Sequence, residues 1–277
     1  MIGGEMVVAV AVGALLMGGI YGLVRLSRRL WRFLPGRRGV RLCGEPVPAG
    51  WPGIVHRYVP LTRRLTPAER DRLLRLTQLL LHEVPIDGCN GLTVDETMRV
   101  TIAATACLLL LNLPYPRFPT LRRILLYPDT FVPRRVPSPL DRGIQDEPEP
   151  LLGEAHDSGV VILSWEGVLA RRDGHNVVLH EFAHVLDGEN GAFDGIPLLE
   201  GASLMTWGRV LADEFAHAQD AAERDDEPAL DDYAATNRAE FFAVATEAFF
   251  EEPERLRQRL PEVYRLLSLF YHTEQAT

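Results

Sequence analysis

The sequence predicts a mostly helical α+β protein with a small sheet, preceded by one N-terminal transmembrane helix. Of its 277 residues, 47% are apolar and 24% are charged, which is the balance of an ordinary globular protein. Capping boxes open amphipathic segments typical of helices, whereas short apolar runs bounded by Gly or Pro are typical of strands. No repeat of about 20 to 50 residues is visible, so solenoids and propellers are not expected.

The N-terminal segment, residues 1–41, predicts a membrane anchor. Residues 6–24 are uncharged and mostly apolar, and seven Arg follow between Arg25 and Arg41. A cleaved signal peptide would carry its positive charge before the apolar stretch. The Arg-rich side is therefore expected to face the cytoplasm, which makes the chain a single-pass protein of the inner (cytoplasmic) membrane with residues 42–277 in the cytoplasm. The alternative is a buried or interfacial helix weakened by four glycines, in a cytoplasmic protein.

Charge and composition exclude several classes of protein. The net charge is −9, and because residues 1–41 contain seven Arg and a single acid, the remaining residues are more acidic than the chain as a whole. An acidic body repels phosphate backbones, so no nucleic-acid partner is expected. All 29 basic residues are Arg, which excludes a Schiff-base or P-loop lysine within this chain.

Two Thr-x-x-Glu capping boxes, beginning at Thr66 and Thr93, predict two helices. The first is expected to extend to about residue 82. The second includes the apolar run 102–111, which is too short to span a membrane and therefore predicts a core helix ending before Pro114. Residues 124–132 and 160–165 predict strands, and the Pro-rich residues 133–150 predict an exposed irregular loop.

The chemistry is concentrated in a His-Glu-x-x-His pattern at His180, Glu181 and His184. Four residues are about one helical turn, so both imidazoles can meet one zinc ion, while Glu181 lies at the edge of the same face. Zinc lowers the pKa of a bound water toward about 7, and the carboxylate can take its proton as the water attacks a carbonyl. The flanking apolar residues suit a buried helix that ends near Gly188 or Gly191. The alternative is a pair of structural histidines.

A catalytic zinc usually has three protein ligands, so a third must come from elsewhere. Asp187, Asp194, Glu240 and Glu247 are the candidates, and we favour Glu240 because a carboxylate set among apolar residues is costly to bury without a metal or partner. The alternative is that Glu240 only completes an N-terminal cap with Asn237.

Two further groups in this region leave their roles open. Glu247, two helical turns after Glu240, either orients a zinc-bound histidine or is a solvated helix residue. Residues 213–217 (Asp-Glu-Phe-Ala-His) resemble the His-Glu-x-x-His pattern but lack its leading His, so we call them the decoy.

Three stretches together, residues 180–187 (HEFAHVLD), 232–235 (DYAA) and 239–253 (AEFFAVATEAFFEEP), resemble the Mlc titration factor A family of zinc peptidases. The resemblance covers roughly residues 55–272. It implies that residues 42–277 form a zincin-like metallopeptidase domain similar to the catalytic domain of anthrax lethal factor. It further implies a gluzincin site with one Zn2+ per chain, in which His180, His184 and Glu240 are the ligands and Glu181 is the general base.

The resemblance also points to Tyr233, seven residues before Glu240, as a catalytic donor to the developing oxyanion; the alternative is an aromatic that packs on the core. Residues 160–165 could supply an edge strand on which an extended peptide pairs.

Two function classes follow from these observations. The first is a zinc-dependent peptidase acting on a peptide or protein substrate and tethered to the membrane by its N-terminal helix. The second is a regulatory protein that binds and sequesters a partner such as a transcriptional repressor, with a mainly structural zinc site. Glu181 and Tyr233 favour the first, because a structural site usually closes with four ligands and needs no carboxylate beside a water.

Overall fold

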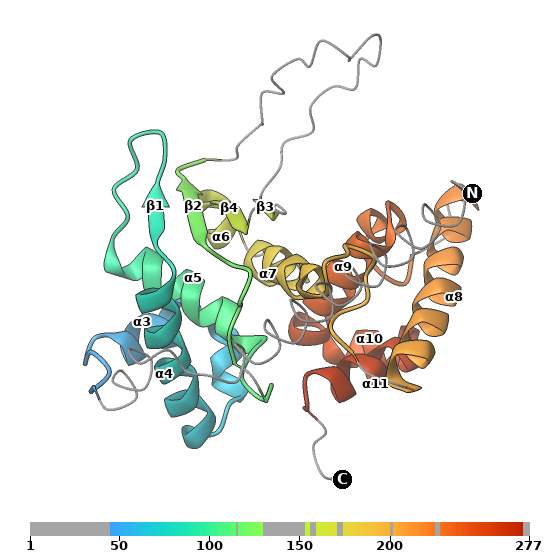
Figure 1. The fold of residues 1–277 in the computed structure, drawn as a ribbon, viewed down its shortest axis with the longest axis horizontal. Coiled ribbons are helices and arrows are strands. Elements are labelled where there is room, and N and C mark those ends of the chain that lie inside the picture. The colour runs from blue at the N-terminus through green and yellow to red at the C-terminus, as the bar shows by residue number, and fades with distance from the viewer. Residues whose placement is uncertain are drawn as a thin grey trace, which may run out of the picture. The chain divides into compact units, whose positions relative to one another are not determined.

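Helices make up most of the described chain, as the sequence predicts. The computed structural model describes residues 45–114, 116–129, 153–155, 159–170, 174–199, 202–224 and 228–273. From Pro46 onward these residues belong to one unit (Figure 1). The elements in chain order are α3 (Trp51–Tyr58), η1 (Pro60–Arg64), α4 (Pro67–Glu83), β1 (Ile86–Gly88), α5 (Glu96–Leu108), β2 (Arg123–Tyr127), β3 (Gly153–Ala155), β4 (Val160–Ser164), α6 (Trp165–Leu169), α7 (Val177–Asp187), η2 (Gly188–Asn190), α8 (Ala202–Arg224), η3 (Asp232–Ala235), α9 (Arg238–Glu251), α10 (Pro253–Arg259) and α11 (Pro261–Phe270).

Two predicted segments, the membrane span at residues 6–24 and the irregular loop at residues 133–150, lie outside the described residues. Within the part of the chain that is described, no helix has both the length and the apolar character needed to cross a bilayer. The predicted span therefore stays a prediction.

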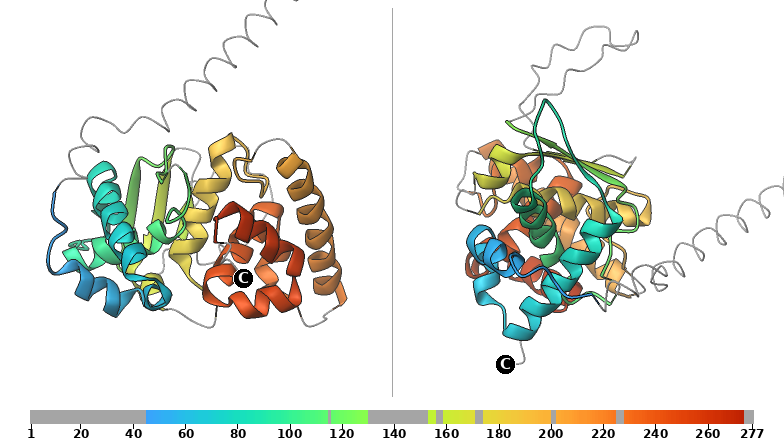
Figure 2. Two further views of the ribbon diagram at one scale, coloured as in Figure 1. Left: turned by 90° about the horizontal axis from the view of Figure 1, so that it is seen from below. Right: turned by 90° about the vertical axis from the view of Figure 1, so that its left-hand side faces the viewer.

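The small sheet has four strands in the order β1, β2, β4, β3. The first three are parallel, and β3 pairs antiparallel with β4. Parallel strands need a crossover, and α5 provides it between β1 and β2. The sheet lies over α5 and α7 (Figure 2), and α7 contacts both β3 and β4. Alternate residues such as Ile124, Leu126, Val161 and Leu163 are fully buried, which joins the sheet to the core.

The two strand predictions are confirmed in place, but the ends of both strands and the edge position of the second need correction. β2 stops at Tyr127 instead of continuing toward residue 132, because Pro128 has no N–H with which to extend the ladder. β4 stops at Ser164, whose side chain accepts a hydrogen bond from the Gly167 N–H and caps α6. The prediction that residues 160–165 form an edge strand is wrong: β4 pairs with β2 on one side and β3 on the other, so its backbone groups already have partners.

The first predicted capping box is confirmed and the second is wrong. Thr66 Oγ1 accepts from the Glu69 N–H, and Glu69 Oε2 accepts from the Thr66 N–H at 2.7 Å, as a capping box requires. In α5 the cap is Asp95, not Thr93, and its side chain accepts from the Met98 N–H. Residues 102–111 are buried throughout, as expected of a core helix, although the regular helix ends at Leu108.

The centre of the molecule is the packing of α7 against α9. α7 lies between the sheet and α9 (Figure 1). Its apolar residues Leu179, Phe182 and Ala183 are fully buried. The Phe182 and Phe118 rings pack edge to face, with their centroids 4.8 Å apart. α9 contributes a matching set of buried apolar residues, among them Phe241, Phe242, Ala243 and Ala245. Both helices are therefore held in position by core packing, apart from any polar contact between them.

Gly195 fixes the chain that follows α7. Its N–H donates to Asp187 Oδ2 at 3.0 Å, and its carbonyl accepts from Trp207 Nε1 at 3.0 Å. Its φ is +77°, and a Cβ at this position would stand 2.3 Å from the Arg238 carbonyl oxygen. Gly195 thus contacts α7, α8 and the start of α9. No side chain fits at this position.

Gly195→Ala is expected to lower the free energy of unfolding by about 2–4 kcal/mol, because it combines a positive φ with a backbone clash. Gly191→Ala is the matched control, since Gly191 has φ +88° but nothing within 4 Å of the added Cβ. It should cost only about 1–2 kcal/mol. Thermal or denaturant unfolding of both variants measures the difference, and equal losses would contradict the predicted clash.

Candidate metal centre

The two histidines of the pattern project from one face of α7. The helix begins at Val177 because Asn176 caps it, with its side-chain oxygen accepting from the Leu179 N–H at 3.2 Å. His180 and His184 are one turn apart, and their Nε2 atoms lie 3.2 Å from each other. The predicted helical placement of both residues is thus what the structure shows.

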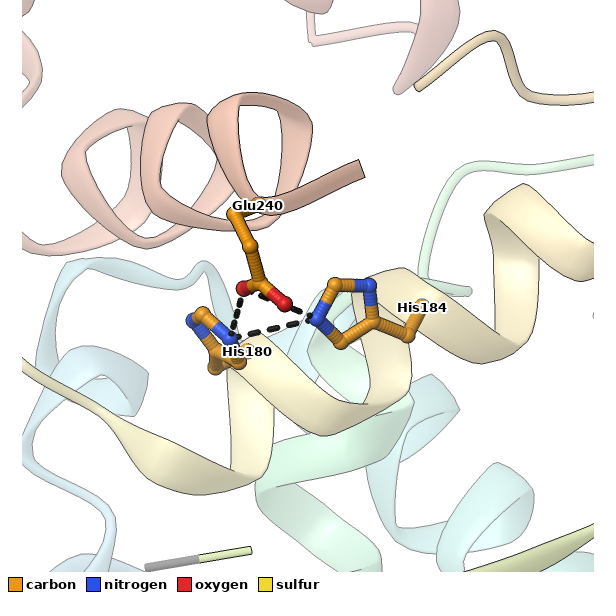
Figure 3. A group of neighbouring side chains, drawn as sticks. All are labelled: His180, His184 and Glu240. Carbon is orange, nitrogen blue, oxygen red and sulfur yellow. Dashed lines mark hydrogen bonds and ion pairs between the residues drawn. The ribbon is translucent and has the colours of Figure 1, made fainter. Parts of the chain in front are cut away.

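The carboxylate of Glu240, from the first turn of α9, meets both imidazoles. Its Oε2 lies 3.0 Å from His180 Nε2 and 3.2 Å from His184 Nε2 (Figure 3). Within the described ranges, these three residues form the one group of His, Cys, Asp and Glu side chains close enough to hold a metal ion. The structure therefore brings together the three residues that the sequence predicts as ligands.

Both interpretations of Glu240 that the sequence leaves open describe part of its environment. Asn237 is the N-cap of α9, and its side chain accepts from the Glu240 backbone N–H at 3.0 Å. The Glu240 side chain, however, points at the histidines of α7 (Figure 3). The cap sets the backbone position of Glu240 and leaves its carboxylate available for the site.

The charges at the site reinforce one another. Burial lowers the pKa of His180, but hydrogen bonds to Glu240 and Glu247 outweigh it and, with the nearby charge of Glu181, raise the pKa to about 10. Burial likewise raises the pKa of Glu240, and the hydrogen bonds from His180 and His184 outweigh it, so this pKa falls to about 2. The carboxylates thus create a strongly negative environment around two imidazoles, which favours a cation between them.

The donor set fits a metal ion. Around a tetrahedral ion with bonds of about 2.0–2.1 Å, neighbouring ligand atoms are about 3.3 Å apart. The three separations here are 3.0–3.2 Å. Two imidazole nitrogens and one carboxylate oxygen are donors that zinc accepts readily. Only small side-chain movements would bring His180, His184 and Glu240 around one ion.

Glu181 and Tyr233 both lie near His180, but Glu181 is buried and Tyr233 is exposed to solvent. Glu181 is only 3% exposed and is close enough to His180 to raise its pKa. Tyr233 on η3 is 40% exposed, and its ring centroid lies 6.0 Å from that of His180. A buried carboxylate and a solvent-facing phenol therefore border the same histidine.

The other third-ligand candidates have different partners. Asp187 is fully buried and accepts from the Gly195 N–H, and Asp194 is exposed and accepts from the Ile196 N–H. Glu247 is buried and touches His180 on its other ring nitrogen, Nδ1, at 2.7 Å. Glu247 is therefore not a solvated helix residue.

Sequence reasoning missed the role of Asn176. Its backbone N–H donates to Glu247 Oε2 at 2.5 Å, and its side-chain amide donates to Glu251 Oε1 at 2.7 Å. An Asn immediately before an apolar run is a signal for an N-cap, and this signal was present. The contacts to α9, 71 and 75 residues away, have no local signal.

The buried Asp187 carboxyl should make the stability of the fold depend on pH. Burial raises the pKa of this carboxyl from 3.8 to about 7, against the opposing hydrogen bond from Gly195. Between these values the folded protein binds more protons than the unfolded one, so its stability falls as the pH rises from about 4 to 7. Asp187→Asn removes this titration. Its stability relative to the wild type, measured by urea unfolding with a chelator present, should increase between pH 5 and pH 8. The same pH dependence in both proteins would contradict the raised pKa.

Comparison with known proteins agrees with this arrangement. The model of the family described as glucose-regulated metallo-peptidase M90 matches residues 34–272. An uncharacterized protein of Synechocystis sp. is 37% identical over 246 residues, covering 86% of this chain and 88% of its own. Mlc titration factor A of Serratia proteamaculans is 33% identical (77% of this chain, 83% of its own), and that of Salmonella agona is 30% identical (81% and 86%). The chain belongs to the M90 family of metallopeptidases.

Proposed function

We propose that this protein is a zinc-dependent peptidase of the gluzincin type. The observation that carries the proposal is the meeting of His180, His184 and Glu240 at one point, with Glu181 buried beside them. Membership of a metallopeptidase family supports it. His180, His184 and Glu240 would hold one zinc ion per chain and leave a fourth position open, as catalytic rather than structural sites do. The zincin-like fold and the likeness to anthrax lethal factor stay predictions.

The chemistry divides between the ion and the protein. Zinc, when bound, supplies a Lewis acid that polarises a peptide carbonyl and makes water acidic near neutral pH. Glu181 is the general base: its carboxylate takes a proton from the attacking water and later gives it to the leaving amine. Glu181 follows His180 directly in α7, so the helix holds the base at a constant position relative to a ligand.

Tyr233 is the residue that we assign to the oxyanion. Its ring lies beside His180, and its exposure on η3 places it where a substrate can reach it. A phenol that donates a hydrogen bond to the developing oxyanion stabilises charge that appears only in the transition state, which lowers the barrier without tightening substrate binding.

The substrate strand pairs with β3 in this proposal. β3 is the edge of the sheet next to α7, and among the described residues its outer side has no neighbouring strand. An extended peptide can add to such an edge through backbone hydrogen bonds, and such pairing alone would give little selectivity for the peptide sequence. This replaces the role that the sequence predicts for residues 160–165.

A regulatory role is the second candidate, and the name of two relatives, Mlc titration factor A, favours it. Proteins called Mlc titration factor A align with 77–81% of this chain. A regulatory protein partner, such as a repressor, would then bind this chain as well, alongside catalysis or instead of it. The predicted membrane anchor at residues 6–24 would confine either activity to the inner-membrane surface.

The test compares Glu240→Ala and Glu181→Gln with the wild type. Wild-type protein should contain about one zinc per chain and cleave a mixed peptide library. Glu240→Ala should lose zinc because a ligand is removed, whereas Glu181→Gln should keep zinc and lose about 10²–10⁴-fold in kcat because only the base is removed. Metal analysis and mass spectrometry of the products measure both effects.

The decoy on α8 offers matched controls. His217 is exposed, and its Nδ1 lies 3.4 Å from Glu214 Oε2. The pair has the same residue types as the motif but does not belong to the candidate metal centre. His217→Ala and Glu214→Gln should leave zinc content and cleavage unchanged. A wild type that holds zinc, cuts nothing and is indistinguishable from Glu181→Gln would overturn the peptidase proposal and leave the binding role.

Tyr233→Phe should lower kcat by about 10²–10³-fold with little change in KM, because one oxyanion donor is lost while the ring remains. Zinc content should be unaffected. Steady-state kinetics on a peptide from the library separates the two constants. A rise in KM with unchanged kcat would instead assign Tyr233 to substrate binding.

A further inference from the structure

Glu247 joins the two helices of the metal centre through both of its oxygens. Oε1 lies 2.7 Å from His180 Nδ1, and Oε2 accepts from the Asn176 backbone N–H at 2.5 Å. The carboxylate is only 5% exposed. A buried carboxylate is costly unless its oxygens have donors, and these two donors come from the beginning and the first full turn of α7.

These contacts determine which nitrogen of His180 can bind a metal. An ionised carboxylate only accepts hydrogen bonds, so it holds the proton of neutral His180 on Nδ1. The lone pair is then on Nε2, the atom that faces His184 and Glu240. A negative partner on Nδ1 also makes the imidazole a stronger ligand, and such partners typically contribute about 10–100-fold to metal affinity.

Asn176 contacts both Glu247 and His180 through its backbone, and its carbonyl accepts from the His180 N–H at 3.0 Å. Its backbone N–H holds one oxygen of Glu247, while its side chain caps α7 and donates to Glu251, one turn further along α9. The backbone contact survives any substitution of the Asn176 side chain except proline. The chain thus offers a variant that weakens the helix start and spares the Glu247 contacts.

We propose that Glu247 is a positioning residue that sets the tautomer and direction of His180 and thereby the metal affinity of the site. The inference rests on the proposed function, because it assumes that His180 binds the ion. It decides between the two roles that the sequence leaves open for Glu247, which lies two helical turns beyond the Glu240 ligand in α9.

The experiment measures the zinc affinity of the full-length protein by competition with a chelator of known affinity. Glu247→Gln keeps the shape of the side chain, but its amide has one donor end. That end must face either His180 Nδ1–H or the Asn176 N–H, so one of the two hydrogen bonds is lost along with the charge. We expect the zinc affinity to fall about 10–100-fold.

Asn176→Ala is the structural control. It removes the cap and the bond to Glu251, so Tm should fall by about 2–4 °C, with zinc affinity within about threefold of the wild type. The absorption bands of bound Co2+ report ligand geometry directly. They should change in Glu247→Gln and stay as in the wild type in Asn176→Ala.

Glu247→Ala offers a rescue. Glu247 lines a pocket of about 210 Å³, together with His175 and Arg255, so its truncation opens a path from this pocket to His180 Nδ1. Added formate should restore part of the zinc affinity of Glu247→Ala, and uncharged formamide should not. Wild-type protein with formate controls for direct binding of formate to zinc.

The outcomes separate this inference from the proposed function. Glu247→Gln with wild-type zinc affinity and Co2+ bands overturns the inference, whatever its Tm. Wild-type protein that binds zinc but hydrolyses no peptide overturns the peptidase proposal alone, since the affinity comparison still decides the role of Glu247. Wild-type protein that binds no zinc overturns both.

Discussion

The contact between the carboxylates of α9 and the imidazoles of α7 is the interaction on which the rest of the site depends. Glu240, Glu247 and Glu251 follow one another at seven and four residues, so they lie along one side of an otherwise apolar helix. Burying them against an apolar neighbour would be costly. His180, His184 and the amide groups of Asn176 face this side, and each carboxylate has a hydrogen-bonding partner among them. These polar contacts offset the cost of burying the three carboxylates where core packing brings the two helices together.

Both helices begin with an asparagine cap, and each cap lies close in sequence to a proposed metal ligand. Asn176 and Asn237 each accept from the N–H three residues later, so each helix starts at one defined residue. His180 then follows its cap by four residues and Glu240 by three. Core packing fixes how α7 and α9 lie together, and a slip of either helix by one residue within that packing would turn its ligands about 100° away from the site.

The sequence predicted those features whose interactions join residues close together in the chain. The spacing of His180 and His184, and the Thr66 box, follow from contacts within one or two turns, and the structure agrees with both. Glu240 was found through a local conflict, a carboxylate among apolar residues. The prediction of a capping box at Thr93 is wrong because Asp95, closer to the apolar run, caps the helix instead. β3 has only three residues and no alternation to detect, so the edge of the sheet was assigned to β4. The Asn176–Glu247 contact joins residues 71 apart and has no local signature.

The groups of the site divide according to the rigidity of the elements that carry them. The three proposed ligands and Glu181 are on α7 and α9, which are long, capped and packed in the core. The groups proposed to meet substrate, Tyr233 and the edge of β3, are on a four-residue 3₁₀ helix and a three-residue strand. Ligand geometry has to be held within fractions of an ångström, whereas substrate contacts can vary. Under the proposed function, substitutions on η3 and β3 would therefore change substrate contacts while the separations among His180, His184 and Glu240 stay as they are.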